Sequence, residues 1–167
     1  HIAAGYADRY RVAALDMSGH GDSGRRESYS LETWTDEVMA VVRDADMLDK
    51  PIIVGHSMGG FVTIVTAAMH SDELAGVIVC DSPVTEPDPE VDAARIGAAF
   101  GRPRVYQNPE EALARFRTVP PQASTLDFVM AELGRRSLGP VEGGWSWKFD
   151  HRVFGAFDGN PRSIARP

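Results

Sequence analysis

The feature that most constrains the fold of this chain is a serine placed between a short apolar run and a longer one. Residues 51–54 are rich in β-branched side chains, and the run stops at Gly55. Ser57 follows in a Gly-His-Ser-Met-Gly segment, and residues 61–69 are apolar enough for a buried helix. This order predicts a strand, a sharp turn and a helix, with the serine on the turn.

A serine in this position has the requirements of a nucleophile. A strained turn projects the hydroxyl clear of the backbone, and Gly55 and Gly59 on its two sides would let strand and helix approach closely. The helix that starts beside Ser57 directs free N–H groups toward developing negative charge. We therefore predict Ser57 as the nucleophile and the Met58 N–H as one oxyanion donor. The alternative interpretation is a tight turn that merely contains a serine.

Other segments predict a sheet around this turn. Residues 11–16 and 74–81 form apolar runs typical of buried strands. Ser30 is a suitable N-cap for an amphipathic helix over 31–48. Strands without alternation, separated by helices, predict an α/β protein whose parallel sheet is covered by helices on both faces. In such a sheet Ser57, Asp81 and the loop 19–24 would lie beyond the carboxyl ends of the strands.

Two motifs carry a resemblance to a known family. One is the Gly-x-Ser-x-Gly segment at 55–59, and the other is an Asp-x-x-Gly-x-Gly-x-Ser loop at 16–23. Together they resemble the central portion of the α/β-hydrolase fold, in its lid-bearing serine hydrolase and esterase branch. The resemblance implies that the loop shapes the floor near the site, so His20 is not expected to carry a proton.

The same resemblance divides the chain into three parts. Residues 1–82 would be a core segment, 83–160 a helical lid or cap region, and 161–167 a return toward the core. Helices are predicted at about 90–100, 109–117 and 125–138, without a strand among them, and 143–150 would be the exit of the lid. Trp145 and Trp147 would line an apolar substrate cavity or simply anchor the lid. His56, next to the nucleophile, is a further candidate for substrate contact.

A serine nucleophile needs a general base, and in this fold an acid and then a histidine follow the serine along the chain. After Ser57 the histidines are His70 and His151, and neither stands where the family places its base. Asp81 is a candidate for the acid, with a structural or loop-capping role as the alternative. The resemblance therefore implies that the second oxyanion donor and the catalytic histidine lie outside this sequence. We expect a segment of a longer hydrolase, or one with unobserved ends, without full activity in isolation.

Composition excludes several kinds of partner. The net charge of −7 argues against nucleic acid and against an anionic membrane surface. No apolar run reaches the length of a membrane span. The single cysteine, Cys80, lies in an apolar strand run and is expected to be a small buried hydrophobe, which fits a cytoplasmic setting. No metal or organic cofactor is implied, and the oligomeric state is left open.

These observations predict a serine hydrolase that acts on a small apolar ester or carbonyl substrate through an acyl-enzyme. Cleavage of a carbon–carbon bond in a diketone is the alternative within the same fold, because that branch shares the serine and the lid. The alternative from another class is a non-catalytic small-molecule-binding module that keeps the hydrolase fold.

Overall fold

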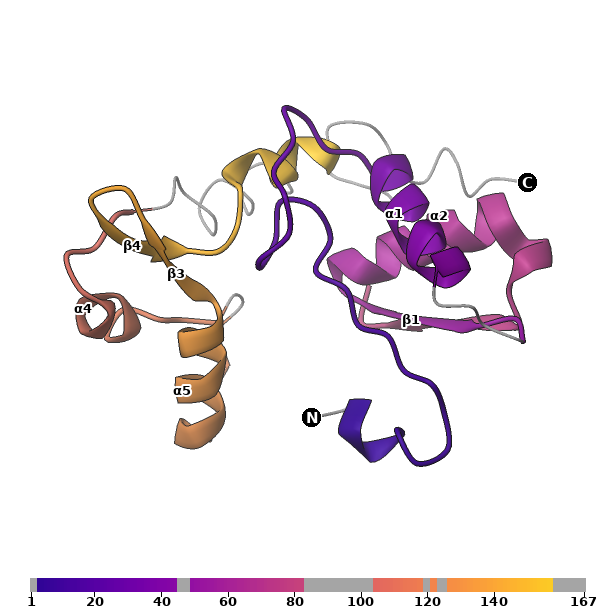
Figure 1. The fold of residues 1–167 in the computed structure, drawn as a ribbon, viewed down its shortest axis with the longest axis horizontal. Coiled ribbons are helices and arrows are strands. Elements are labelled where there is room, and N and C mark those ends of the chain that lie inside the picture. Colours follow the sequence, from indigo (N-terminus) through magenta and orange to yellow (C-terminus); the bar gives the residue numbers. More distant parts are fainter. Residues whose placement is uncertain (1–2, 45–48, 83–103, 119–120, 123–125, 158–167) are drawn as a thin grey trace.

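The structure is a computed structural model of the 167-residue chain, and it describes residues 3–44, 49–82, 104–118, 121–122 and 126–157. After the 3₁₀ turn η1 (Ala3–Gly5), a loop leads to helix α1 (Leu31–Asp44). Strand β1 (Ile52–His56), helix α2 (Met58–His70), the turn η2 (Ser71–Glu73) and strand β2 (Gly76–Cys80) complete the core (Figure 1). None of the described helices has the length and apolar character needed to cross a membrane.

Helix α1 begins where the sequence predicts. Ser30 accepts a hydrogen bond from the Thr33 N–H at 3.1 Å, which satisfies a donor that the first turn would otherwise leave free. Trp34 is fully buried, and its indole N–H donates to the Ser18 carbonyl at 3.0 Å. The tryptophan therefore joins α1 to the loop before it. The predicted residues 45–48 of this helix lie outside the described part of the chain.

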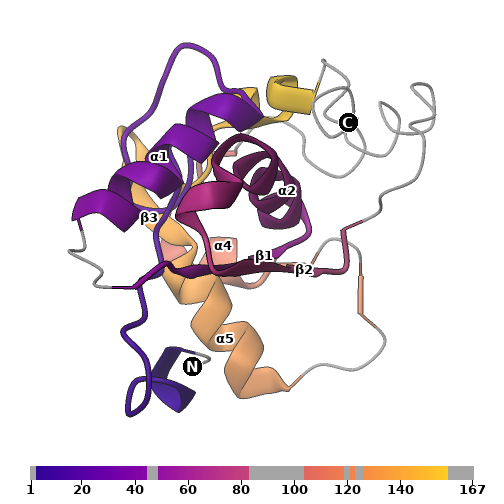
Figure 2. The same cartoon turned by 90° about the vertical axis from the view of Figure 1, so that its right-hand side faces the viewer.

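The core is layered on one side of a parallel sheet. Strands β1 and β2 pair in register from Ile52–Gly76 to His56–Cys80. In both views α2 lies on the sheet and α1 on α2 (Figures 1 and 2). The main core cluster joins these helices to the loop before α1 and to the turn near the end of the chain, through Tyr29, Leu31, Trp34, Val62, Val65 and Val153.

The opposite face of the described sheet carries exposed apolar side chains. Ile52 is 57% exposed and Val54 64% exposed, because they point away from α2. Cys80 is exposed as well, so the prediction that it is buried is wrong. The strand predicted at 11–16 is also wrong, since the structure assigns no strand to this segment. A strand exists only where a neighbouring strand forms a ladder of hydrogen bonds with it, and no described segment forms such a ladder with residues 11–16.

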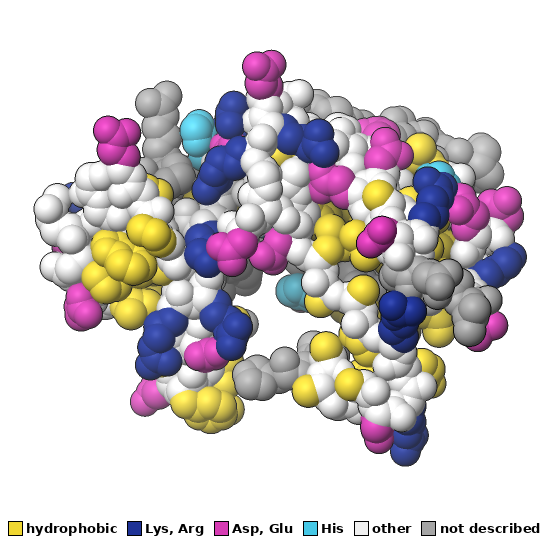
Figure 3. Space-filling view, viewed as in Figure 1, with side chains coloured by type: hydrophobic (Ala, Val, Ile, Leu, Met, Phe, Trp, Pro, Cys, Tyr) yellow, Lys and Arg dark blue, Asp and Glu magenta, His cyan; other side chains and the backbone are white. Residues whose placement is uncertain are grey.

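A second group of elements, which we call the hairpin unit (residues 104–118 and 126–148), has its own small core. It contains α4 (Pro109–Leu113), α5 (Asp127–Arg136) and an antiparallel pair, β3 (Leu138–Val141) and β4 (Gly144–Trp147). Its buried cluster consists of Tyr106, Ala112 and Leu138. Hydrophobic side chains remain exposed at the start of α5, where Phe128 is 70% exposed (Figure 3).

Two of the predicted helices appear in the hairpin unit, and the third, at 90–100, lies outside the described residues. Helix α4 has Pro109 in its first turn, and the Asn108 side chain caps it by accepting from the Glu111 N–H at 2.9 Å. The sequence predicts no strand in this region, and this prediction is wrong, because β3 and β4 form an antiparallel pair. Glu142 and Gly143 link β3 to β4, and Gly143 has a φ of +84°, which favours glycine at the second position of the turn.

The turn η3 (His151–Phe157) returns to the core through a buried carboxylate. Asp150 is 5% exposed and accepts a hydrogen bond from the Tyr29 hydroxyl at 2.9 Å. Arg152 forms an ion pair with it at 2.6 Å. The Asp150 N–H donates to the Gly19 carbonyl at 2.8 Å. These bonds connect residues more than a hundred positions apart and attach the end of the hairpin unit to the loop before α1.

This attachment predicts acid sensitivity. Hydrogen bonds from Arg152, and from Tyr29, hold the Asp150 pKa well below its ordinary range despite burial. A carboxyl whose pKa is lowered by folding adds stability above its unfolded pKa of about 4, and that contribution is lost progressively as pH falls below about 5. Urea denaturation should therefore show a smaller loss of stability between pH 5 and pH 2 in Asp150→Asn than in wild type. The exposed variant Asp36→Asn is the control and should keep the wild-type loss; equal losses in all three proteins would contradict the assignment.

Candidate active site

Ser57 occupies the sharp turn that the sequence predicts. Strand β1 ends at His56, and α2 begins at Met58, so the serine is the only residue between them. Its φ of 52° and ψ of −117° are unfavourable for a residue with a side chain. Such a conformation costs about 1–3 kcal/mol and persists only where the surroundings enforce it. The residue is exposed, and its hydroxyl has no hydrogen bond within the described part of the chain.

Close packing around the turn explains two of its glycines. A Cβ on Gly55 would lie 2.2 Å from both the Gly59 carbonyl oxygen and the Thr63 hydroxyl. A Cβ on Gly60 would lie 1.8 Å from the Ser82 hydroxyl. A Cβ on Gly59 would meet open space. The prediction that glycines on both sides allow close approach is thus right for Gly55, but Gly60 takes the role expected of Gly59.

The backbone around Ser57 leaves donors available. Met58 and Gly59 are the first two residues of α2, and their N–H groups have no acceptor within the helix. The Ser57 N–H donates to the Cys80 carbonyl at 3.1 Å, and the Ser82 hydroxyl donates to the Ser57 carbonyl at 2.8 Å. The turn is therefore bonded to the end of β2 on both sides of Ser57. Sequence reasoning did not single out Ser82, which looks like the first residue of a proline-rich connection.

Asp81 lies at the matching end of the neighbouring strand. Because His56 pairs with Cys80 in the register, Ser57 and Asp81 directly follow two paired strand ends. Asp81 is exposed and has a φ of 48°; with Ser57 it makes up the described non-glycine residues of positive φ. The structure thus brings the two predicted residues to one edge of the sheet. The role of Asp81 as an acid stays a prediction.

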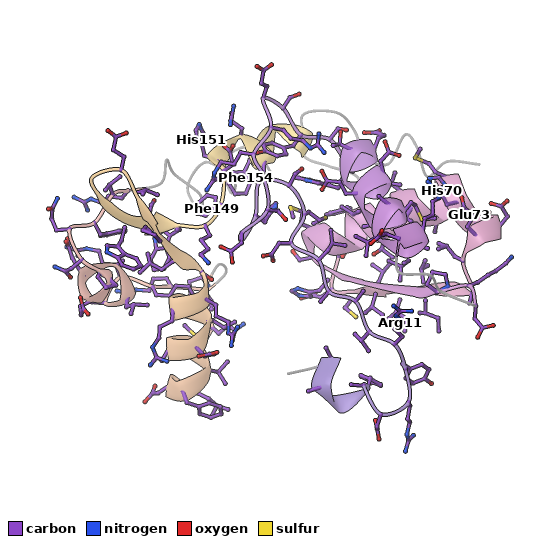
Figure 4. The ribbon with its side chains drawn as sticks, in the orientation of Figure 1. Arg11, His70, Glu73, Phe149, His151 and Phe154 are labelled. Atoms are coloured by element: carbon purple, nitrogen blue, oxygen red, sulfur yellow. The ribbon has the colours of Figure 1, made fainter. Side chains whose placement is uncertain are left out.

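The described histidines differ in their surroundings, and none is hydrogen-bonded to Ser57. His70 lies at the far end of α2, where its Nδ1 is 3.0 Å from the Glu73 carboxylate (Figure 4). His151 is half exposed beside Asp150, close to Phe149 and Phe154 (Figure 4). His20 packs edge-on against Trp34. His56 is exposed at the end of β1, and its predicted contact with substrate stays a prediction.

Both tryptophans of β4 belong to the apolar cluster of the hairpin unit. Trp145 and Trp147 pack against its buried residues. The ring of Trp147 lies 5.5 Å from that of Phe116 and 6.1 Å from that of Tyr106. These contacts lie within the hairpin unit itself, so the anchoring of a lid on the core also stays a prediction. Their contact with substrate stays a prediction.

A pocket of about 680 Å³ lies away from the serine, between α1 and the loop before it. Burial alone would raise the Glu37 pKa, but hydrogen bonds from Ser18 and Arg26 outweigh it and hold that pKa below its ordinary value. Arg26 also forms an ion pair with Glu37 at 2.8 Å, so these two charges of the pocket are matched to each other. No three histidine, cysteine or acidic side chains converge on a possible metal position within the described ranges.

The parallel strands and the helix between them agree with the fold that comparison with known proteins shows. Residues 2–149 match the model of the alpha/beta hydrolase fold. Because this match covers most of the sequence, the chain belongs to the α/β-hydrolase family.

Curated and solved relatives are similar to this chain over different lengths. A 2-(acetamidomethylene)succinate hydrolase of Mesorhizobium japonicum is 30% identical over 143 residues, which are 83% of this chain and 49% of that protein. A pyrethroid hydrolase of Sphingobium wenxiniae is 35% identical over 80 residues, 47% of this chain and 28% of that protein. A crystal structure of E-2-(acetamidomethylene)succinate hydrolase superposes with a TM-score of 0.77 at 18% identity, over 98% of this chain and 61% of that one, and shows the fold. The chain spans less than half the length of these curated relatives.

The glycine contacts lead to a paired prediction on stability. Gly55→Ala should lower the free energy of unfolding by about 1–3 kcal/mol, because the new methyl group has no room between strand and helix. Gly59→Ala should leave it unchanged or raise it by up to about 1 kcal/mol, because alanine favours a helix and meets open space. Urea denaturation of both variants measures the difference, and equal losses would show that the close approach at Gly55 is not as described.

Proposed function

We propose that the protein is a serine hydrolase that acts on a small apolar ester or related acyl compound through an acyl-enzyme. The observation that carries this proposal is the strained, exposed Ser57 at the start of α2. Ser57 is held at a φ of 52°, and its hydroxyl makes no hydrogen bond in the described part of the chain. Backbone strain of this kind is concentrated at active sites, so we infer that the hydroxyl has a catalytic role. The names of the relatives, which include two hydrolases, support the same class of reaction.

In the proposed reaction, Ser57 Oγ attacks the carbonyl carbon of the substrate while a general base takes the hydroxyl proton. The carbonyl oxygen becomes an oxyanion and accepts a hydrogen bond from the Met58 N–H, which the positive end of α2 supports. The alcohol then leaves with a proton, and water hydrolyses the acyl-enzyme and restores the serine. Since none of the described histidines is bonded to Ser57, we assign the base to a histidine other than His20, His56, His70 and His151.

Two further parts of the proposal concern the substrate. The hairpin unit acts as the lid, with Asp150 attaching it to the core. Trp145 and Trp147 hold its apolar cluster together, and their exposed edges and His56 contact the substrate. Asp81 is the candidate for the acid that orients the base, because it lies at the same edge of the sheet as Ser57.

A fluorophosphonate probe tests the nucleophile directly. The protein as its gene encodes it should be labelled at Ser57, because the hydroxyl displaces fluoride from phosphorus only when it is activated. Ser57→Ala should abolish labelling, measured by intact mass and peptide mapping. Ser28→Ala, which removes an exposed serine hydroxyl elsewhere, should label like wild type.

The same experiment separates an enzyme from a binding module. An enzyme should also release p-nitrophenol from p-nitrophenyl acetate, with the release lost in Ser57→Ala. A folded wild-type protein that neither takes the label nor hydrolyses this ester would overturn the proposal in favour of ligand binding without turnover.

A further inference from the structure

Ser82 lies where it can act on the proposed oxyanion donor without touching the substrate. Its hydroxyl donates to the Ser57 carbonyl at 2.8 Å, while its other acceptor within reach, the Cys80 carbonyl, is 3.4 Å away. The shorter contact identifies the Ser57 carbonyl as the principal acceptor. This bond joins the residue after β2 to the turn after β1, across 25 positions of the sequence.

The Ser57 carbonyl and the Met58 N–H belong to the same peptide group. Because that group is planar, a bond that fixes the direction of the carbonyl also fixes the direction of the N–H on its opposite side. A hydrogen bond to the carbonyl further polarises the peptide and makes its N–H a stronger donor. The Ser82 hydroxyl can therefore orient and strengthen the Met58 N–H together.

The surroundings of this carbonyl show what the Ser82 bond adds. The Ser57 carbonyl also accepts hydrogen bonds from its own helix, from the Gly60 N–H at 3.0 Å and the Phe61 N–H at 3.4 Å. Both of these bonds come from the helix side of a residue with strained backbone angles. The Ser82 bond is the shortest of the three and comes from the neighbouring strand.

Ser82 fits tightly against the start of α2. A Cβ on Gly60 would meet the Ser82 hydroxyl at 1.8 Å, so the glycine leaves the space that this hydroxyl occupies. On the other side of Ser57, its N–H donates to the Cys80 carbonyl at 3.1 Å. The end of β2 thus holds both peptide groups that flank Ser57, one through a backbone carbonyl and one through a side chain.

We propose that Ser82 is a positioning residue that aligns and polarises the Met58 N–H for the oxyanion. This inference rests on the proposed function, since it assigns a task to Ser82 within the reaction of Ser57. This role differs from a purely structural one, because Ser82 acts through the single peptide group between Ser57 and Met58. Loss of its hydroxyl should therefore change the reactivity of Ser57 more than the stability of the protein.

The test compares Ser82→Ala with Ser82→Thr in the protein as its gene encodes it. The measurement is the second-order rate of Ser57 labelling by a fluorophosphonate, whose phosphoryl oxygen needs the same donor as an ester oxyanion. Loss of an oxyanion donor lowers the reaction rate by about 10²–10³-fold. A misaligned donor should lower the rate less, so we expect the alanine variant to react about tenfold more slowly. Threonine keeps the hydroxyl and should restore the rate. Ser23→Ala, which removes a serine-to-carbonyl hydrogen bond to Asp16, should react like wild type.

A spectroscopic measurement reports the effect without any reaction. In ¹H–¹⁵N spectra the Met58 amide nitrogen should shift upfield in Ser82→Ala and return in Ser82→Thr, because the peptide loses and regains its polarising bond. If the alanine variant does not fold, Ser82→Cys, with its weaker thiol donor, should react more slowly than wild type but by less than about tenfold.

The outcomes separate the two levels of the argument. Absence of labelling at Ser57 in the wild-type protein would overturn the proposed function. Normal labelling in the wild type together with an unchanged rate in Ser82→Ala, or in Ser82→Cys if alanine prevents folding, would overturn the role of Ser82 alone. Slow labelling in both Ser82→Ala and Ser82→Thr would assign the effect to packing and would also overturn it.

Discussion

The geometry at Ser57 depends on hydrogen bonds between the ends of two parallel strands. The residues at the end of β2 help to hold Ser57 in its strained backbone conformation, because the Cys80 carbonyl bonds to its N–H and the Ser82 hydroxyl bonds to its carbonyl. The packing of α2 on the sheet enforces the same geometry, since Gly55 leaves no room for a side chain between strand and helix. Strain at the serine is thus sustained by hydrogen bonds and close packing that extend well beyond the five-residue motif.

A second connection relates this core to the hairpin unit. The buried Asp150 contacts the loop before α1 through Tyr29 and Gly19, and Lys148 pairs with Asp22 of the same loop at 2.6 Å. The glycine-rich loop therefore serves as the attachment point for the residues that follow β4. This gives a physical task to a loop that the family resemblance describes as non-catalytic.

Local patterns allowed part of this structure to be predicted. The turn at Ser57, the cap at Ser30 and the start of α4 at Pro109 follow from neighbouring residues, and the structure confirms them. The strand at 11–16 was predicted wrongly, because its apolar run carries no information about whether a partner strand is present. The β3–β4 hairpin was missed since Gly139 and Pro140 disfavour a strand, although the Glu142–Gly143 turn was a usable signal.

Contacts distant in sequence were beyond such reasoning. Nothing near Ser82 indicates that its hydroxyl reaches Ser57, and nothing near Asp150 indicates that Tyr29 will donate to it. The exposure of Cys80 was likewise unpredictable, because burial of a strand depends on what covers each face of its sheet. The role of Ser57 as a nucleophile could therefore be predicted from the motif. The groups that hold its backbone in place could be identified only from the structure.

The most direct test of the central claim is a crystal structure of the protein after reaction with a fluorophosphonate. We expect phosphorus bonded to Ser57 Oγ, with a phosphoryl oxygen about 2.7–3.1 Å from the Met58 nitrogen. Phosphorus on another residue, or an adduct on Ser57 whose oxygens all point away from the start of α2, would contradict it.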